Sequence, residues 1–477
     1  MLTPEEELGL AGRAVMGRVE RAVHSLGDRA LRELLRAIEG ESRADGLIYL
    51  RDGVADVVRV FSTPLPLRPE QVQYLHAISL ELHNATRRLA SLYLADERVR
   101  AALELPPAEE AWLRELWTPA HAEENPVFGR LDAVFDAAAS HWKAGLLFLE
   151  TNMNGVGGLH LWPTAERVQA RVVWPALTQV DPALKFELGQ DVRNLLMQQL
   201  IDHLEAVGAP GRCICFVEPK YSGSGPEDQA ALAEHFVRHF GVQVLHADPA
   251  ELSWDNERAR YRGAAVDLVY RDYSVEDLLA LEASGVDVTP MRELFRRNRV
   301  VSSLAAELDQ KSVFEVLTDP ELGAAHFTHE ERRLFRRHVP WTRLVRERRC
   351  LLSDGTVGDL LEHARAEQEH LVLKPNRDYG GRGVYVGRVV SMSSWEEALQ
   401  AAALKPNGWV LQRAVPLPVQ EFPVVEHDRV RHQPFYVVIG LAPTEDGVAV
   451  LGRASQKQVV NIAQRGGLVV FPVTSNH

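Results

Sequence analysis

The chain has little of several features that would assign it to a particular class of protein. Its 477 residues include only three cysteines, Cys213, Cys215 and Cys350, too few for a disulfide framework. The first two alternate in the run CICFVE, so a strand there would turn both to one face, and we expect buried thiols. No apolar run reaches the roughly 18 residues of a membrane span, and the start MLTPEEELGLAGR has no basic segment followed by an apolar stretch. These absences predict a cytoplasmic protein with no membrane partner.

Positive charge is also scarce. The sequence has 53 Lys and Arg against 66 Asp and Glu, a formal net charge of -13. Nucleic-acid binding needs clustered positive charge, so a nucleic acid is not expected as the main partner, and an anionic ligand must be met by a local pocket. One stretch, 332–349, holds eight arginines. We interpret it as a solvated helix face and loop whose charges meet the acidic remainder of the chain.

The hydrophobic pattern divides the chain into three regions. A chain that is 46% hydrophobic and 25% charged can bury several cores. Residues 1–142 have a helical apolar period and predict a helical N-terminal lobe. Residues 143–300 alternate short apolar runs with amphipathic helices, which predicts an α/β substrate-binding domain. Residues 301–477 continue with a mainly helical stretch and then strands at LVLK, GVYVG, WVLQRAV, PFYVVIGLA and VAVLGRAS, which makes the last region α+β.

The segment LVLKPNRDYGGRGVYVG, residues 371–387, carries the clearest chemical signal. A short strand ends in Lys374, a loop follows with Gly380, Gly381 and Gly383, and a second strand resumes. This order excludes a Walker A loop and a Rossmann fingerprint, because both need the glycines to open a helix. Glycines let backbone N–H groups approach phosphate oxygens and let the hairpin move as a lid, while Lys374 would add a point charge. The alternative is an ordinary hairpin with a surface lysine.

Two other segments could serve the same ligand. Lys311, in LDQKSVFEVLTD, begins an apolar helix, although such a lysine is often simply exposed to solvent. WVLQRAV could be a hinge strand whose backbone edge from Leu411 to Ala414, including Gln412, pairs with adenine. The alternative for this run is an ordinary core strand.

The segment FLETNMNGVGGLH, residues 148–160, suggests a metal site. On a strand, Glu150 and Asn152 project from the same face because they are two residues apart. A carboxylate and an amide oxygen side by side suit Mg²⁺, which prefers oxygen ligands and bridges to phosphates. The alternative is a strand-end glutamate and an asparagine that caps the glycine bend.

In chain order these segments resemble the circularly permuted ATP-grasp ligases, and specifically the eukaryotic-type glutathione synthetase family. In that family the metal-binding Glu-x-Asn strand precedes the nucleotide-binding lysines, as Glu150 and Asn152 precede Lys311 and Lys374 here. Residues 374–378, KPNRD, are similar to the family's Lys-Pro-x-Arg-Glu, which implies that Asp378 is the third metal ligand. Tyr385 falls where the family has a lid tyrosine.

The same resemblance implies the substrate contacts. Residues 269–273, VYRDY, are similar to a family run that contacts the acyl substrate, which implies roles for Arg271 and Tyr273. Arg453 followed by Gly466 and Gly467 is similar to the family's terminal arginine and Gly-Gly substrate loop. Gln229 lies near a family substrate glutamine.

The sequence also departs from the family. It has His432 and Gln433 where an acidic residue is expected, and Ser455 where a lysine is expected, with Lys457 as a stand-in. These positions concern the acceptor and ribose contacts, so glutathione synthesis itself is not assumed.

The resemblance implies an ATP-dependent carboxylate–amine ligase with a circularly permuted ATP-grasp fold. It would use ATP and two Mg²⁺ ions, form an acyl phosphate and release ADP and phosphate, with Lys374 and Arg453 as catalytic residues. Its partners would be a small-molecule carboxylate, either an amino acid or a peptide, and an amine acceptor; a homodimer is left open. Two rivals are a small-molecule kinase of the same fold and a non-catalytic nucleotide-binding or scaffold protein.

Overall fold

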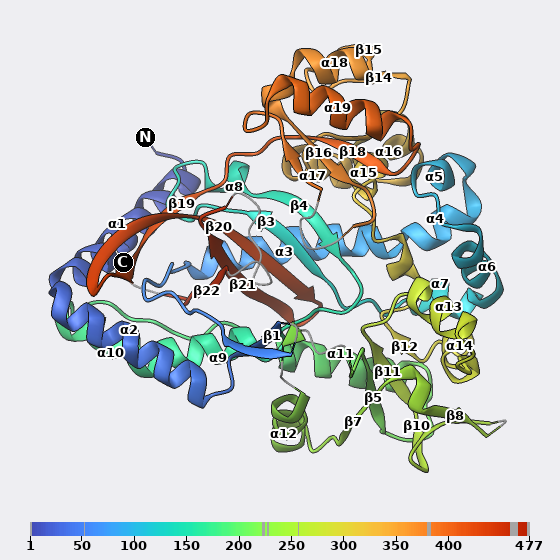
Figure 1. Cartoon of the computed structure of the whole chain (residues 1–477), viewed down its shortest axis with the longest axis horizontal. Helices are drawn as coiled ribbons and strands as arrows, with labels where there is room; N and C mark the ends of the chain where they lie inside the picture. Colours follow the sequence, from blue (N-terminus) through green and yellow to red (C-terminus); the bar gives the residue numbers. More distant parts are fainter. Residues whose placement is uncertain are drawn as a thin grey trace.

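One large antiparallel sheet crosses the regions that the sequence pattern separates. The computed structural model describes residues 2–51, 53–221, 225–226, 229–255, 257–378, 383–457 and 466–474. The sheet order is β22-β21-β20-β3-β4, with β19 paired to β20 (Figure 1). The strands are β3 (Arg130–Val134), β4 (Leu147–Asn152), β19 (Val419–Glu426), β20 (Arg429–Thr444), β21 (Gly447–Ser455) and β22 (Gly467–Val469). The sheet contains strands from all three predicted regions: β3 lies before residue 142, β4 lies between 142 and 300, and β20 to β22 lie after 300. The predicted boundaries are therefore not boundaries of this sheet.

The expected α/β layer is present and is built on a parallel sheet of order β12-β11-β5-β7. Every residue of β5 and β11 is buried, as expected for parallel strands covered on both faces. The strands are β5 (Ile214–Val217), β7 (Val244–Ala247), β11 (Leu268–Arg271) and β12 (Val300–Val301), and the nearby helices are α11 (Val192–Ala206), α12 (Gln229–Phe240), α13 (Val275–Ala283) and α14 (Thr289–Arg296). A small antiparallel sheet of β8 (Leu252–Trp254), β9 (Ala259–Tyr261) and β10 (Ala264–Val266) lies beside it.

A smaller lobe, at the top of Figure 1, holds the glycine-rich segment. Its antiparallel sheet has the order β13-β18-β16-β17, formed by β13 (Thr342–Leu344), β16 (Leu371–Pro375), β17 (Tyr385–Val386) and β18 (Trp409–Arg413). It packs against α18 (Leu360–Ala366) and α19 (Met392–Ala403) around a core of its own that includes Leu371, Leu373, Trp395 and Leu411. A hairpin of β14 (Arg349–Leu351) and β15 (Val357–Asp359) completes it.

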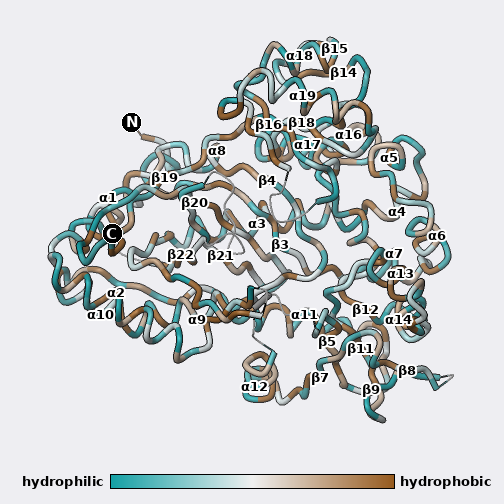
Figure 2. Tube along the Cα trace, viewed as in Figure 1, coloured by the Kyte–Doolittle hydropathy of each residue, from teal (hydrophilic) through white to brown (hydrophobic). Residues whose placement is uncertain are grey.

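The N-terminal helices do not form a separate lobe. Thr3 and Glu6 form a capping box that starts α1 (Pro4–Ser25), and Pro4 occupies its first turn, where a missing N–H costs no helical bond. Hydrophobic and hydrophilic residues alternate along α1 and α2 (Gly27–Ala44) as the helices turn (Figure 2). Their buried residues Val19 and Leu31 share one core with Ile214 of the α/β layer and Leu451 of the large sheet. The helices of the predicted 1–142 lobe therefore pack into a core that they share with later parts of the chain.

The remaining elements cover the sheets and connect them. A hairpin of β1 (Ile48–Arg51) and β2 (Val54–Val57) interrupts the predicted helical run and pairs with β6 (Gly225–Pro226). The other α-helices are α3 (Pro69–Arg87), α4 (Leu89–Ala95), α5 (Glu97–Ala102), α6 (Pro107–Leu116), α7 (Pro119–Glu123), α8 (Trp142–Gly145), α9 (Leu161–Val168), α10 (Trp174–Val180), α15 (Val313–Thr318), α16 (Pro320–His326) and α17 (His329–His338). Across the described ranges, no helix is both long enough and apolar enough to cross a membrane.

The cysteines are only partly as expected. All three are free thiols, but only Cys215, inside β5, is buried. Cys213 precedes the strand and is half-buried, as is Cys350. The prediction of buried thiols is right for Cys215 alone, because β5 begins one residue after Cys213.

Arg271 joins β11 to the segment after β12 and belongs to the core. Its side chain is 0% exposed and forms an ion pair with Glu307 at 2.6 Å. It also donates to the carbonyl oxygens of Tyr273, Ser302 and Ser303, at 2.6, 2.7 and 2.9 Å. The prediction that Arg271 contacts a carboxylate substrate is therefore wrong for this structure, because a buried guanidinium held by these acceptors presents no free fork to a ligand.

This buried pair predicts a large stability effect. Arg271→Met should lower the free energy of unfolding by about 3–5 kcal/mol, because it leaves the Glu307 carboxylate buried without a counter-charge. Denaturant unfolding measures this change. The exposed Arg29, paired with Glu33, is a matched control, and Arg29→Met should change stability by less than about 1 kcal/mol.

The double variant Arg271→Met/Glu307→Leu should recover most of the loss, because it removes both charges. A double variant as unstable as Arg271→Met would show that packing around Arg271, and not the ion pair, sets the cost.

Candidate functional site

Lys311 brings together segments that are far apart in the chain. It lies just before α15, and its Nζ donates to the carbonyl oxygen of Asp378 at 2.7 Å. The same Nζ lies 3.6 Å from Oε2 of Glu150 on β4. One ammonium group therefore connects the end of β4 in the large sheet with the end of the β16 segment in the small lobe.

Lys374 lies on β16, on the face of the small lobe turned toward β4. Its Nζ donates to Oε1 of Gln412 at 2.7 Å, and Gln412 Nε2 donates to Thr342 Oγ1 at 3.1 Å. Gln412 Nε2 also reaches the carbonyl oxygen of Leu149 at 3.4 Å. Lys374 keeps some exposed surface, yet the protein around it desolvates the ammonium and lowers its pKa to about 8, while the nearby Glu150 opposes this shift. Among the described residues, no carboxylate forms an ion pair with Lys374.

Glu150 and Asn152 share one face of β4, as the spacing predicts. In the ladder Glu150 is opposite Asp132 and Asn152 is opposite Arg130. Thr151, between them, points the other way, and its hydroxyl donates to Asp309 Oδ1 at 2.6 Å. The amide N–H of Met153 donates to Asp309 Oδ2 at 2.8 Å, so this one carboxylate fixes the end of the strand. Burial raises the pKa of Asp309 to about 6.

Arg453 belongs to a row of charges beside this strand. Its Nη2 lies 2.6 Å from Asp132 Oδ2, while Arg130 Nε donates to Asp132 Oδ1 at 2.8 Å. Burial by itself raises the pKa of Asp132, but the two guanidinium groups hold it at about 2. Two arginines thus share one carboxylate, and within the described ranges Arg453 Nε has no hydrogen-bond partner.

Arg130 and Asp132 were not singled out from the sequence. The available signal was the alternation of Arg130 and Asp132 in FGRLDAV, directly before the strand that carries Glu150. Gly440 on β20 makes room for this row, because a Cβ there would lie 2.5 Å from Cδ of Arg130.

Residues between Lys374 and Asp378 form polar contacts that connect the small lobe to the rest of the chain. Asn376 is buried; its Oδ1 accepts the N–H of Ser312 at 2.9 Å and its Nδ2 donates to Gln310 Oε1 at 3.0 Å. Arg377 pairs with Glu109 of α6 at 2.5 Å. These two positions have structural roles on either side of the candidate site.

The glycine segment is described in part. Gly380 and Gly381 lie outside the described residues. Gly383 has a φ of +68°, and a Cβ there would lie 3.0 Å from Cγ of Pro375, so glycine is favoured at this turn. Tyr385 starts β17 opposite Leu373, with its ring 6.2 Å from the ring of Trp409.

The hinge prediction needs correction. β18 is an inner strand, and Gln412 pairs with Thr342 on one side and with Val372 on the other. The N–H of Ala414 donates to the carbonyl oxygen of His370 at 2.8 Å. The backbone of Leu411 and Gln412 and the N–H of Ala414 are therefore not open to adenine. The side chain of Gln412 contacts Lys374.

The predicted substrate residues are placed on the α/β layer and on β22. Gln229 begins α12, and the hydroxyl of Tyr273 donates to Asp248 Oδ2 at 2.8 Å. Gly467 pairs with Ala454, next to Arg453, and Gly466 directly precedes it. A Cβ on Gly467 would lie 2.7 Å from a ring carbon of Phe61, so packing alone accounts for this glycine.

The structure also places the residues at which the sequence departs from the glutathione synthetase family. His432 stacks on His24 with ring centroids 4.4 Å apart, and these rings line a cavity of about 280 Å³ with Glu20 and Glu421. The hydroxyl of Ser455 accepts the N–H of Lys457 at 3.1 Å.

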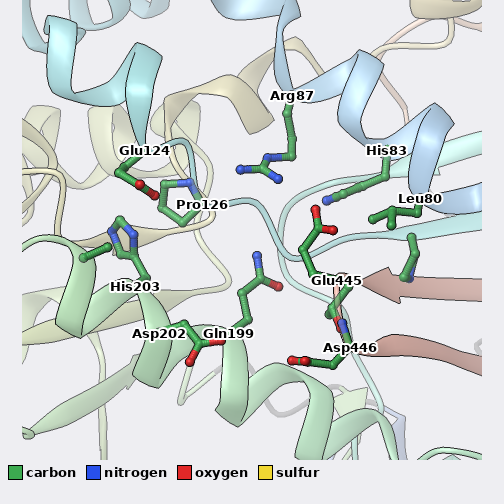
Figure 3. A pocket seen from close by; sticks show the side chains of 13 residues that line it. Leu80, His83, Arg87, Glu124, Pro126, Gln199, Asp202, His203, Glu445 and Asp446 are labelled. Carbon is green, nitrogen blue, oxygen red and sulfur yellow. The ribbon is translucent and has the colours of Figure 1, made fainter. Parts of the chain in front are cut away.

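A separate cavity of about 240 Å³ lies between α3, α11 and the β20–β21 turn (Figure 3). His83, Arg87, Gln199 and Glu445 point toward it. Burial lowers the pKa of His83 to about 3, so its imidazole is neutral. None of the predicted site residues lines this cavity.

Comparison with known proteins supports the fold. Neither the models of known families nor the sequences of curated proteins match the chain. Among solved structures it is similar to a glutathione synthetase-like effector from Globodera pallida in its apo form, with a TM-score of 0.62 and 12% sequence identity. The match covers 94% of this chain and 97% of that chain. The chain therefore has a mixed α/β fold that resembles a glutathione synthetase-like protein.

Proposed function

We propose that the chain is an ATP-dependent ligase that joins a carboxylate to an amine. The observation that carries this proposal is the meeting of Glu150, Lys311 and the Asp378 segment at one ammonium group, with Lys374 close by. The fold, which resembles a glutathione synthetase-like protein, supports it, and so does the order of Glu150 before both lysines, which agrees with a permuted ATP-grasp chain.

The cationic groups fit the phosphates of a nucleotide. Lys374 donates to the neutral amide of Gln412, and among the described residues its charge has no carboxylate in ion-pair contact. Such a charge is costly in desolvated surroundings unless an anion joins it. Arg453 adds a second positive charge near this strand, fixed by Asp132.

The oxygen donors fit Mg²⁺. The side chain of Glu150 is 36% exposed, and Asn152 lies two residues further on the same strand face. Within the described ranges, no three His, Cys, Asp or Glu side chains form a metal-binding group, so the proposed site depends on the Asn152 amide as well as on Glu150 and Asp378. When bound, Mg²⁺ would neutralise charge on the phosphate oxygens.

The roles of the chain's own residues follow from this arrangement. Lys311 and Lys374 would orient the phosphates for transfer to the substrate carboxylate, and transfer would give an acyl phosphate and ADP. Arg453, fixed by Asp132, would stabilise the charge that develops as the amine attacks and phosphate leaves. The hairpin between β16 and β17 would keep water from the acyl phosphate.

The decisive experiment is a search for products. Purified protein with ATP and Mg²⁺ should release ADP and phosphate only when an amino acid or peptide carboxylate and an amine are both present, and mass spectrometry should find the amide. A phosphorylated substrate without an amide would indicate a kinase. Unchanged ATP across all combinations of amino acids, peptides and polyamines would contradict an enzymatic role.

Lys374→Ala should reduce ATP-dependent turnover by at least about 100-fold, because it removes a phosphate contact inside the cleft. It should also abolish the thermal shift produced by ATP while the melting temperature without ATP stays close to wild type. Lys405, exposed at the end of α19, is the matched control, and Lys405→Ala should behave as wild type. An unchanged ATP-dependent rate in Lys374→Ala would make this lysine a structural residue.

ATP affinity should depend on pH through Lys374. Desolvation holds the pKa of this lysine at about 8 in the free protein, so the ammonium loses its proton as pH rises through that value. The apparent Kd for ATP should then increase, by up to about tenfold per pH unit, because the neutral amine no longer attracts phosphate. Titrations between pH 7 and 9.5 measure this, and Lys374→Met should bind ATP weakly without that step. A flat wild-type profile would contradict the assignment.

A further inference from the structure

A cavity of about 490 Å³ lies beside the end of β18, at the base of the small lobe near α15 and α17. Its walls come from residues 317–320, 332–343 and 413–416, with Leu147 and Leu351. The sequence suggested a solvated face for the arginines of 332–349. Four of these arginines line this cavity together with Arg413; of the four, Arg336 and Arg337 are exposed to solvent as predicted and Arg343 is buried.

The cavity has a strong excess of positive charge. Its five arginines are Arg332, Arg336 and Arg337 of α17, Arg343 of β13 and Arg413 of β18. Asp319 is the only carboxylate among the lining residues, and its Oδ1 accepts two N–H groups at the start of α16. Arg337 has a 3.9 Å contact with Glu5, and in the described part of the chain the other four form no ion pair.

Arg343 shows that an acceptor is missing. Its side chain is 0% exposed, and Nη1 donates to Thr318 Oγ1 at 3.1 Å and to the carbonyl oxygen of Thr342 at 2.7 Å. Its Nε and Nη2 have no hydrogen-bond partner among the described residues. Buried N–H groups of a charged side chain are nearly always satisfied. These two are covered by neighbouring side chains, so an anion in the cavity would reach them only after a side-chain movement. Two N–H groups on one edge of a guanidinium are the fork that holds two phosphate oxygens.

This cavity lies on the opposite side of the small sheet from Lys374. Gln412 and Thr342 are paired in the ladder, and their side chains meet on the Lys374 face. Side chains alternate along a strand, so Arg413 and Arg343, one residue further on each, face the back of the sheet. A ligand there would not occupy the nucleotide cleft.

The rest of the wall is apolar. It includes Leu147, Leu317, Val339 and Pro416 beside the ring of Trp341. The Arg343 guanidinium lies 5.5 Å from the centroid of that ring, and the Trp341 N–H is already used by the carbonyl oxygen of Leu351 at 2.8 Å. The ring therefore offers apolar surface to a ligand and no free donor.

We propose that this cavity is a second ligand site that binds a phosphomonoester with an apolar or aromatic group. The arginines would hold the phosphate, and Trp341 with its neighbours would pack against the organic part. This site is independent of the proposed ligase activity, because it uses neither Lys311 nor Lys374.

Calorimetric titration with phenyl phosphate tests the proposal on the full chain. Wild type should bind phenyl phosphate at least tenfold more tightly than inorganic phosphate, and phenol should not bind. Arg336→Gln/Arg337→Gln changes two exposed arginines of the wall, so the fold should be kept while affinity falls at least tenfold.

The matched control is Arg333→Gln/Arg349→Gln, which removes two exposed arginines of the same stretch that do not line the cavity. It should bind phenyl phosphate within twofold of wild type, as should Lys374→Ala. The proposal would be overturned if wild type did not bind phenyl phosphate, or if both double variants lost affinity equally. It would also be overturned if Lys374→Ala lost affinity, because the ligand would then bind near Lys374.

Discussion

The contact of Lys311 with both Glu150 and the Asp378 carbonyl is the interaction on which the candidate site depends. Glu150 belongs to the large sheet and Asp378 to the small lobe, and each lobe has its own hydrophobic core. Apolar packing stabilises each part but is not directional, so it does not by itself fix where one set of polar groups lies against the other. Hydrogen bonds between Asn376 and the segment around Lys311 also fix the position of the small lobe against the large sheet.

Charge in this region is arranged so that each carboxylate serves more than one group. Asp132 holds Arg130 and Arg453, and Asp309 accepts from Thr151 and from the backbone of Met153. Carboxylates shared in this way position their partners near Lys374. The cationic groups held there are the local positive charges that an acidic chain needs in order to bind an anion.

The sequence predicted local features well and non-local ones poorly. The strands β4, β5, β16, β18 and β20 were recognisable because alternation and apolar runs are local properties. The shared face of Glu150 and Asn152 followed from the same geometry. Strand order is set by contacts between distant segments, so the inner position of β18 was not predictable, and the hinge assignment failed at Leu411 and Gln412 for that reason. Arg271 was misassigned for the same reason, because nothing in its own segment reveals that Glu307 lies against it.

The pairing of β3 with β20 has a consequence for how the chain reaches this structure. These strands are joined through Leu131 opposite Leu441, more than 300 residues away in sequence, and Val60 and Leu67 bridge to Leu468 and Val473. On a ribosome, β3 and β4 would emerge long before the strand that covers their inner edge. An unpaired apolar strand edge attracts other chains during that interval. This sheet can therefore be completed only after most of the chain has been synthesised.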